Sequence, residues 1–509
     1  MDTVTVSFGI LSLLPPLIAV VMAIKSKNVI LSLFCGGLAG ALILNFGNPV
    51  TTLKALIGDY YFVQLTDSYN AGVIVLVMFI GGFIKLMEYS GGAQAFAKSV
   101  SKYICTPARA QIGAWLGGIL IFFSDLGTPL LVGPVFKPIF DKLKISREKL
   151  AWILDSTASP MAILIPFIGW GVYVMGLIQS EFDALGLAES DYSTFVRAIP
   201  FQFYAILCLI SIPFIALTKL DFGPMRKAEL RTQNHPVFEE LPADKAEEEN
   251  GYSTKNAKPA MVLLPILIVF VILFSLLAPQ GFPFAKVDGN DFRVALTMGY
   301  FLASVVLIGM MLLFKVKRFH STFQLYIQGM KGMSEVAIIL ILAWSLSAMI
   351  SQLGTASYII GVLQAVNFSG ALIPAVLFLF GACVSFSTGS SWGTFSILMP
   401  LGIPMAHAFG VDYALCVGAV LSGGLFGDHC SPISDTTILS STGAGCDLSE
   451  HVSTQLPYAL LNAVISFVAY LVAGLTGSVL CLGLAVVLML ATVFGFSKWQ
   501  ARKTATQQG

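Results

Sequence analysis

The chain has 509 residues, of which 56% are hydrophobic and 11% are charged, and its formal net charge is +1. Soluble globular proteins carry about 25% charged residues, so this composition predicts a polytopic membrane protein. The near-zero net charge supplies no basic surface for nucleic acid, which excludes nucleic-acid binding as the main function. The eight cysteines are scattered without disulfide or metal-ligand spacing, and we interpret them as reduced packing residues.

Eleven apolar segments are long enough to cross a bilayer of about 30 Å. They are residues 8–24, 28–46, 71–87, 149–178, 199–218, 259–278, 294–314, 336–351, 413–427 with its polar continuation, 457–476 and 478–497. The first has no basic region before it, so we interpret it as a retained helix rather than a signal peptide. Two further apolar stretches, 112–140 and 371–410, are interrupted midway by Gly, Ser and Thr. This pattern predicts re-entrant hairpins that turn inside the membrane.

The placement of lysine and arginine supports this division into spans and hairpins. With the N-terminus outside, the basic clusters fall on the cytoplasmic side, whereas loops 179–198 and 352–370 are poor in basic residues. The same rule places the C-terminus in the cytoplasm. Residues 219–258 contain a run of charges and are expected to be a solvated, mobile cytoplasmic linker.

The linker separates two halves whose features follow in the same order. Both halves begin with a Leu-Leu-Pro segment, both contain a Phe-Ser break followed by a proline pair, and the run 155–160 matches 427–432. Each half holds an odd number of spans, so the second copy would insert upside down. We therefore predict an all-α polytopic membrane protein of about 11 transmembrane helices in two inverted repeats, each with a broken helix and a re-entrant hairpin. The predicted units are the first repeat 1–218 (hairpin 112–140, broken helix 149–178), the linker 219–258, the second repeat 259–476 (hairpin 371–410, broken helix 413–442), and an extra C-terminal helix and tail 477–509.

A dense polar run occupies residues 426–442 of the second half. A charge at the centre of a membrane helix costs roughly 2.5 to 3.5 kcal/mol on insertion scales, so carboxylates there need a functional reason. Pro432 should break the helix and leave backbone carbonyls unpaired beside the polar side chains. Oxygen ligands on a broken helix favour a small hard cation such as Na⁺. The alternative interpretation is a helix end capped by Asp and Ser side chains.

The residues of this run receive different roles. Asp435 is the preferred titrating carboxylate, because it lies in the continuing helix among threonine hydroxyls, and Asp428 either binds the ion or fixes the break. His429 is expected to be a hydrogen-bonded helper rather than a zinc ligand, because no partner pair has zinc spacing. The predicted metal is Na⁺ at oxygen ligands, with no transition-metal site.

Three other stretches supply candidates. The run at Asp155 is the first-half counterpart of this run. Asp125 has two interpretations, as an ion ligand or as a cap of the turn. The hydroxyls of the second hairpin also have two, as neutral ligands or as small residues that allow close helix packing. Trp392 either lines a substrate cavity or packs. The candidate ion- and proton-binding residues are Asp428, Asp435, Ser431, Thr436, Thr437, Asp155, Ser156, Thr157, Ser159, Asp125, Ser124, Ser387, Thr388, Ser390 and Ser391.

Residues 427–441, followed by His451-Val452 and 454–458, closely resemble the signature of the NhaC-type family of Na⁺/H⁺ antiporters. The resemblance implies membership of a larger ion-transporter superfamily with two inverted repeats, whose members are often homodimers. It also implies secondary antiport of Na⁺ or Li⁺ against H⁺ in a bacterial inner membrane. Some members of the group exchange an organic acid with ions, so the alternative function is transport of an organic acid or amino acid coupled to Na⁺ or H⁺.

Enzymatic and ATP-driven functions are not supported by the sequence. We find no nucleophile and base in register, and no Gly-x-x-x-x-Gly-Lys-Ser/Thr run. No cofactor is expected besides the transported Na⁺ or Li⁺ and H⁺. The expected partners are the lipid bilayer, a small cation and a proton, an organic solute under the alternative function, and a second copy of the chain.

Overall fold

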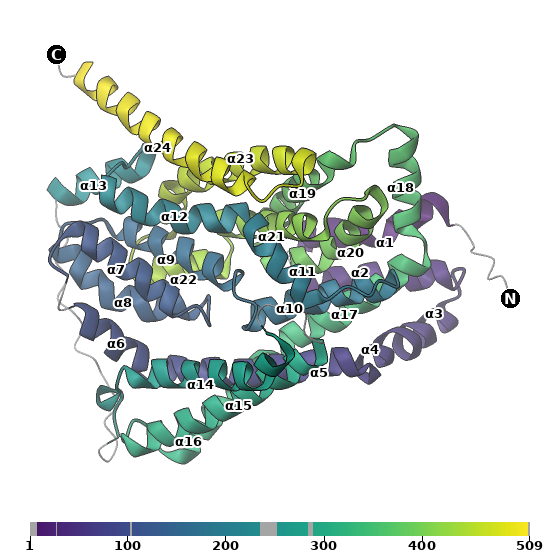
Figure 1. The fold of residues 1–509 in the computed structure, drawn as a ribbon, viewed down its shortest axis with the longest axis horizontal. Helices are drawn as coiled ribbons and strands as arrows, with labels where there is room; N and C mark the ends of the chain where they lie inside the picture. Colours follow the sequence, from purple (N-terminus) through teal and green to yellow (C-terminus); the bar gives the residue numbers. More distant parts are fainter. Residues whose placement is uncertain (1–7, 27, 102–103, 235–251, 283–288, 507–509) are drawn as a thin grey trace.

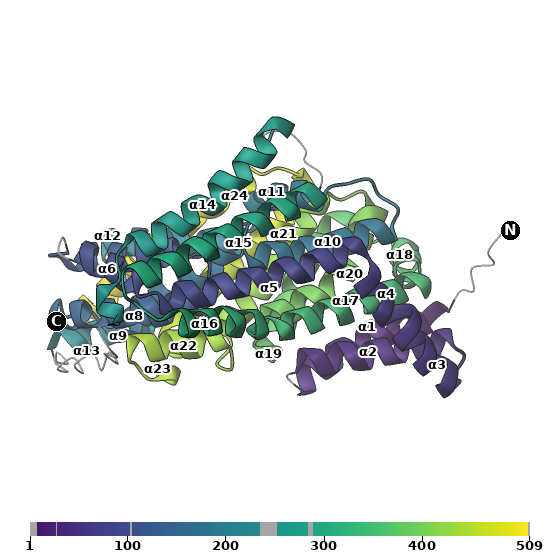
Figure 2. The same ribbon diagram turned by 90° about the horizontal axis from the view of Figure 1, so that it is seen from below.

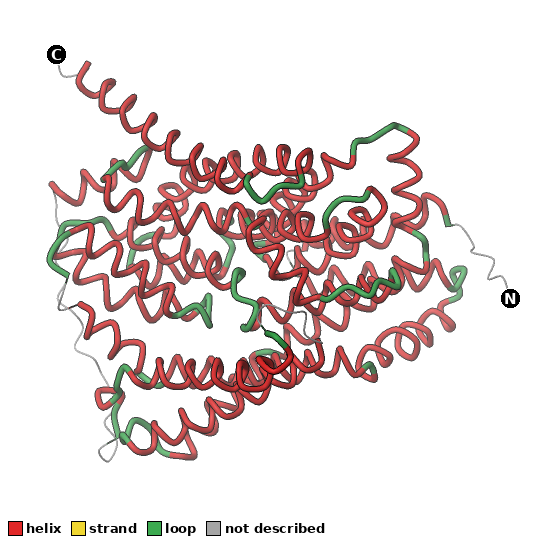
Figure 3. The backbone as a smooth tube through the Cα atoms, in the orientation of Figure 1, coloured by secondary structure: helices red, strands yellow, loops and turns green. Residues whose placement is uncertain are grey.

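The computed structural model describes residues 8–26, 28–101, 104–234, 252–282 and 289–506. Within these ranges the elements are all helical, with no strand, which confirms the predicted all-α class (Figure 3). A helix satisfies its own backbone hydrogen bonds, which is the requirement that a bilayer imposes on an apolar chain.

The helices of the first half and the segment after it are α1 (Leu14–Ser26), α2 (Val29–Leu44), α3 (Pro49–Ala55), α4 (Phe62–Thr66), α5 (Ser68–Tyr89), α6 (Gly92–Ser101), α7 (Pro107–Leu120), α8 (Gly127–Lys142), α9 (Arg147–Ala162), α10 (Gly169–Ala184), α11 (Asp191–Ala198), α12 (Phe203–Thr218) and α13 (Gly223–Asn234). Those of the second half are α14 (Ala260–Leu277), α15 (Gly289–Leu313), α16 (Phe319–Gly332), α17 (Ser334–Gln352), α18 (Thr355–Ala365), α19 (Ile373–Thr388), α20 (Ser391–Phe409), α21 (Tyr413–Cys430), α22 (Asp435–Ala444), α23 (Leu448–Thr476) and α24 (Cys481–Thr506).

The structure does not confirm the predicted number of eleven membrane-crossing helices. Among the described residues, 7 helices are long and apolar enough to cross a membrane, or up to 8 if α11 and α12, bent by 48°, form one span. The chain is therefore a multi-pass membrane protein, but the count of eleven is not confirmed. The apolar parts of α2 and α24 are shorter, and the two predicted broken spans are each split into shorter helices. Residues 370–388, predicted as one arm of a re-entrant hairpin, are long enough to cross.

The predicted breaks and hairpins have direct counterparts among the helices. The segment 149–178 is α9 and α10, separated by residues 163–168, and the segment 413–442 is α21 and α22, separated by residues 431–434. The hairpin 112–140 corresponds to α7 and α8, and the hairpin 371–410 to α19 and α20; the arms of each pack against each other (Figure 1). The relation of the two halves as inverted repeats stays a prediction.

Several helices lie where the hydrophobic pattern predicts loops. These are α3, α4, α6, α16 and α18, which are short or amphipathic. The expected linker is also partly wrong, because α13 occupies its first part and packs against α9 and α23. Ser146 donates from its backbone N and its Oγ to Glu229 of α13, over 2.9 and 2.6 Å. The charges of α13 thus face partners rather than water alone. Residues 235–251 of the expected linker lie outside the described residues.

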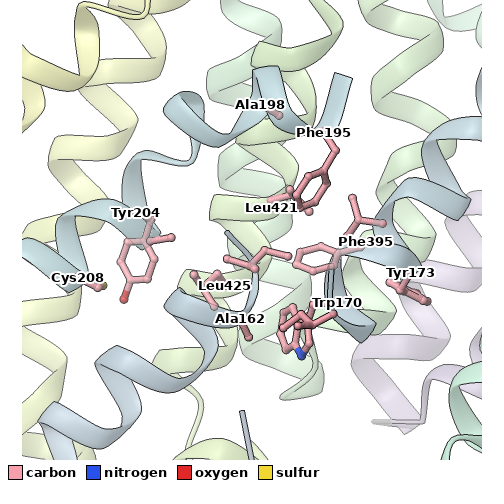
Figure 4. Packing of buried hydrophobic residues seen from close by; sticks show 14 of the residues in the cluster. Ala162, Trp170, Tyr173, Phe195, Ala198, Tyr204, Cys208, Phe395, Leu421 and Leu425 are labelled. Carbon is pink, nitrogen blue, oxygen red and sulfur yellow. The ribbon is translucent and has the colours of Figure 1, made fainter. Parts of the chain in front are cut away.

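The helices are arranged so that the first break lies inside the protein, whereas Pro432 and Ile433 of the second break are exposed. One layer consists of α5, α14, α15 and α16, which pack along one side of the molecule (Figures 1 and 2). Helix α10 packs against α5 of this layer and against α17 and α20. Beside the first break, buried Ala162 and Trp170 lie in one cluster with Phe395, Leu421 and Leu425 of α20 and α21 (Figure 4). Close packing of this kind holds both broken helices in defined positions.

Candidate functional site

The second break forms where the sequence predicts it. Helix α21 ends at Cys430, Ser431 is extended with its N donating to the Asp428 O over 3.0 Å, and Pro432 follows. Pro432 cannot donate a backbone hydrogen bond, so the helix does not continue through it. In the first half Pro160 lies inside α9, and the break begins only after Ala162. The two breaks therefore differ in where they fall relative to proline.

A cavity of ≈ 270 Å³ lies against the second break, and it is the candidate functional site. Its lining combines four carboxylates, three hydroxyls and three aromatic side chains with apolar residues. The polar and aromatic lining residues are Asp125, Asp428, Asp435, Glu335, Ser390, Ser434, Thr436, Phe123, Trp170 and Trp392. They come from the first hairpin turn, the start of α10, the second hairpin turn, the second break and the helix that follows it, and the start of α17. No lysine, arginine or histidine is among the lining residues.

Asp428 is the buried carboxylate of this cavity, with 5% of its surface exposed. Ser391, at the first position of α20, donates from Oγ to Asp428 Oδ2 over 2.8 Å. The second hairpin is also fixed to this region by Ser385, which donates to the Gly424 O over 2.5 Å, and by Ser431, which donates to the Phe386 O over 2.9 Å. The structure thus brings the second hairpin turn and the second break together.

Asp435 lies at the first position of α22, lines the same cavity and is exposed. We predicted Asp435 as the stronger candidate for the titrating group and Asp428 as the weaker one. The structure separates the two carboxylates by burial: Asp428 is enclosed by protein, whereas Asp435 is exposed at the cavity. Which of the two titrates stays a prediction.

The two polar side chains of the first hairpin turn, Ser124 and Asp125, have different surroundings. Asp125 lines the central cavity. The Oγ of Ser124 donates instead to Glu88 Oε1 over 3.0 Å and accepts from the Gly127 N over 2.9 Å. Ser124 therefore shapes the turn and joins it to the end of α5.

Asp155 lies in a different place, at a closed interface of α9 with α22 and α23. Only 1% of its surface is exposed. Its Oδ2 accepts from Gln455 Nε2 over 2.6 Å and from Thr437 Oγ1 over 3.4 Å. The Nε2 atoms of His451 and His429 lie 3.4 and 3.8 Å from the same oxygen. Asp155 does not line the cavity that contains Asp428.

His429 connects the second break to this interface. Its Nδ1 lies 2.7 Å from the Tyr204 hydroxyl and its Nε2 lies 3.1 Å from Ser156 Oγ. Its backbone O accepts from Gln455 Nε2 over 2.6 Å. His429 thus has a hydrogen-bond partner at each ring nitrogen.

The remaining predicted residues do not converge on one ion site. Three hydroxyls donate within their own helices: Thr157 to the Ile153 O, Ser387 to the Cys383 O and Thr388 to the Val384 O. The Oγ of Ser390 accepts from the Gly393 N and caps α20 at the cavity wall. Thr436 also lines the cavity. Ser159 is buried, and its Oγ has no hydrogen-bond partner among the residues that the structure describes.

Sequence reasoning missed several residues of both regions. In the cavity these are Glu335, Trp170 and Ser434. At Asp155 they are His451 and Gln455, which are spaced i and i+4 on one face of α23. Both lie in the stretch that resembles the family signature, and this resemblance and their spacing in an apolar span were the available signals. Among the described residues, no group of three or more His, Cys, Asp or Glu side chains is arranged to hold a metal ion.

Comparisons with known proteins agree with this architecture. The family model described as the Na⁺/H⁺ antiporter family matches residues 161–475, which include Asp428 and Asp435 but not Asp125 or Asp155. An uncharacterized protein of Haemophilus influenzae is 32% identical over 94% of this chain and 93% of its own. The malate-2H⁺/Na⁺-lactate antiporter of Bacillus subtilis is 27% identical over 42% of this chain and 44% of its own. The solved YdaH transporter of Alcanivorax borkumensis has the same fold at 15% identity, with a TM-score of 0.56 over 83% of this chain and 88% of its own.

Proposed function

The chain belongs to the Na⁺/H⁺ antiporter family, and from this premise we propose that it exchanges Na⁺ or Li⁺ for H⁺ as a secondary active transporter. The observation that carries the proposal is the position of Asp428, a buried carboxylate at a helix break that faces a cavity. A multi-pass membrane transporter of this family is not expected to be an enzyme.

The chemistry of the cavity favours a small cation. A carboxylate taken out of water needs a counter-charge, and a cation or a proton can supply it. Asp428 already accepts a hydrogen bond from Ser391, so the ligand set has a carboxylate and neutral oxygens available. Hard cations prefer such oxygen ligands. If Na⁺ and H⁺ compete for the same carboxylate, only one of them is carried at a time, and exchange follows.

The proposal includes the orientation and the assembly expected from the sequence. The N-terminus lies outside, the C-terminus lies in the cytoplasm of a bacterial cell, and the protein is a homodimer in the inner membrane. The cavity is lined from both halves of the chain, by the first hairpin turn and the start of α10 and by the second hairpin turn and the second break, which supports the proposal of two inverted repeats.

Organic-acid or amino-acid exchange is the second candidate function. It is favoured by the similarity to the Bacillus subtilis malate and lactate antiporter and by Trp170 and Trp392 in a cavity of ≈ 270 Å³. The absence of Lys, Arg and His from the cavity lining opposes it, because these side chains bind carboxylates best.

A proton-flux assay on the purified chain in liposomes separates the two functions. The liposomes receive Na⁺, Li⁺, K⁺, malate, lactate and amino acids in turn, with protein-free liposomes as the control. Proton movement driven by Na⁺ or Li⁺ alone is the expected result. Proton movement that requires an organic solute would replace the first function by the second.

A further inference from the structure

The cavity at the second break carries more negative charge than one monovalent cation can balance. Its lining includes the four carboxylates Asp125, Glu335, Asp428 and Asp435. Among the described residues that line it, none is a lysine, an arginine or a histidine. One Na⁺ neutralises one of these charges and leaves the others without a counter-charge. The lining as a whole therefore favours a ligand with more than one positive charge.

The four carboxylates are spread over the cavity rather than gathered at one point. Asp428 is buried and Asp125 is partly buried. Glu335 and Asp435, each in the first turn of a helix, are exposed. Within the described chain, no three His, Cys, Asp or Glu side chains are placed to hold one metal ion. Two positive charges held apart within one ligand therefore suit this lining better than a divalent metal ion.

Aromatic rings form another part of the cavity wall. Trp170 and Trp392 lie with ring centroids 5.0 Å apart, and Phe123 lines the same cavity. Trp170 is buried beside Phe395, with ring centroids 6.0 Å apart (Figure 4). The Tyr173 hydroxyl donates to the Trp392 O over 2.7 Å, which fixes the backbone of that tryptophan. Ammonium groups are attracted to tryptophan faces, whereas Na⁺ binds oxygen ligands and gains nothing from such a wall.

The size of the cavity also exceeds the need of a single ion. Its volume is ≈ 270 Å³, whereas a cavity that holds one water needs about 10–15 Å³. The rest of its wall is aliphatic and consists mainly of Ile80, Ile84, Leu126, Met333, Val336 and Ile339. Each methylene group that such a wall removes from water contributes about 0.8 kcal/mol. The cavity therefore has room and apolar surface for a short hydrocarbon chain.

We propose that this cavity binds an organic diamine, a methylene chain with an ammonium group at each end, in competition with Na⁺. One ammonium group pairs with the buried Asp428, and the other pairs with the exposed Glu335 and Asp435. The chain between them lies against Trp170 and Trp392. Alkylamines are charged at neutral pH, as lysine side chains are. The competition with Na⁺ rests on the proposed function, whereas the binding of the diamine does not.

Calorimetric titration of the purified full chain in Na⁺-free detergent buffer tests this proposal. The probes are 1,4-diaminobutane, butylamine with one charge, 1,4-butanediol with none, and Mg²⁺. We expect the diamine to bind about fivefold to twentyfold more tightly than butylamine, because each exposed ion pair contributes up to about fivefold. The diol should not bind, and Mg²⁺ at the same concentration should not displace the diamine. Added Na⁺ should weaken the binding of the diamine.

Two variants with matched controls locate the binding. Glu335→Gln should lower the preference for the diamine over butylamine by up to about fivefold, whereas Asp183→Asn, an exposed carboxylate outside the lining, should not. Trp392→Ala should weaken the binding of both amines by about twofold to thirtyfold, the range of a cation–π contact. Trp115→Ala is its control, because Trp115 is also partly buried but does not line the cavity.

The possible results separate this proposal from the proposed function. Equal binding of the diamine and the diol, or diamine binding unchanged in both Glu335→Gln and Trp392→Ala, would overturn the diamine site and leave Na⁺/H⁺ exchange untouched. Diamine binding without Na⁺-driven proton movement in liposomes would overturn the transport function and keep the site. If Trp392→Ala does not fold, the comparison of Glu335→Gln with Asp183→Asn still decides the matter, because both side chains are exposed.

Discussion

Replacing Asp428 by asparagine should weaken Na⁺-driven transport far more than the same change at Asp435. Two unit charges 4 Å apart attract by about 4 kcal/mol at the effective dielectric constant of a protein and by about 1 kcal/mol in water. Asp428 is 5% exposed, so the first value applies, and Asp435 is exposed, so the second applies. A difference of about 1.4 kcal/mol is tenfold in affinity.

Na⁺ affinity should therefore fall by about 10³-fold in Asp428→Asn and by about fivefold in Asp435→Asn. The assay is the Na⁺ concentration that gives half-maximal proton movement in everted vesicles, at equal amounts of inserted protein. Asp183→Asn is a control, since Asp183 is an exposed carboxylate away from the cavity. Near-normal transport by Asp428→Asn, or loss of transport in Asp435→Asn alone, would refute the assignment of the buried carboxylate.

Three further predictions concern stability. Gly427→Ala should destabilise the protein by about 1 to 3 kcal/mol, because the added methyl would lie 2.5 Å from the backbone of α19. Gly309→Ala is the control and should not destabilise it, because the space beside Gly309 is open. Thermal unfolding measures both changes. Arg231→Ala should speed proteolysis of α13, because it leaves the buried Glu148 carboxylate unpaired. Burial raises the pKa of Glu229, so its contribution to stability should be lost as the pH rises above the ordinary carboxyl value of about 4. The melting temperature of Glu229→Gln relative to the unaltered protein should therefore rise with pH above about 4, and a difference that stays constant with pH would contradict this.

The local features of the fold were predictable because their causes are local. Pro432 ends a helix by removing a donor, and the small polar residues at 123–129 and 385–394 allow turns between apolar arms. Charged residues at membrane depth are costly, which directed attention to the run that contains Asp428. The structure has breaks and turns at these places.

The contacts between distant segments were not predictable from local chemistry. Nothing near Asp155 in the sequence indicates that Gln455, 300 residues away, donates to it. The burial of Asp428 relative to Asp435 depends on how α20 packs on α21. The sequence of α22 alone does not predict that packing. The contact of α13 with the rest of the protein through Arg231 was not predictable for the same reason. A run of charged residues predicts a solvated segment, and its ion-pair partners are distant in the sequence.

The span count of eleven is not confirmed, for a different physical reason. Hydropathy measures whether a segment is apolar, but it does not reveal where a helix stops. The split of residues 149–178 into α9 and α10 leaves no single helix long enough to cross, and 370–388 does form one. The apolar residues of α16 occupy one face of the helix. Average hydropathy does not identify amphipathic helices of this kind.

The central claim is that Na⁺ and H⁺ compete for the carboxylate of Asp428. It is tested most directly by adding Na⁺ to the purified protein in weakly buffered detergent and measuring the protons released, because a cation that displaces a proton must release it. We predict proton release from the unaltered protein and from Asp183→Asn, and a loss of that release in Asp428→Asn. Na⁺ binding without proton release, or undiminished release from Asp428→Asn, would contradict the claim.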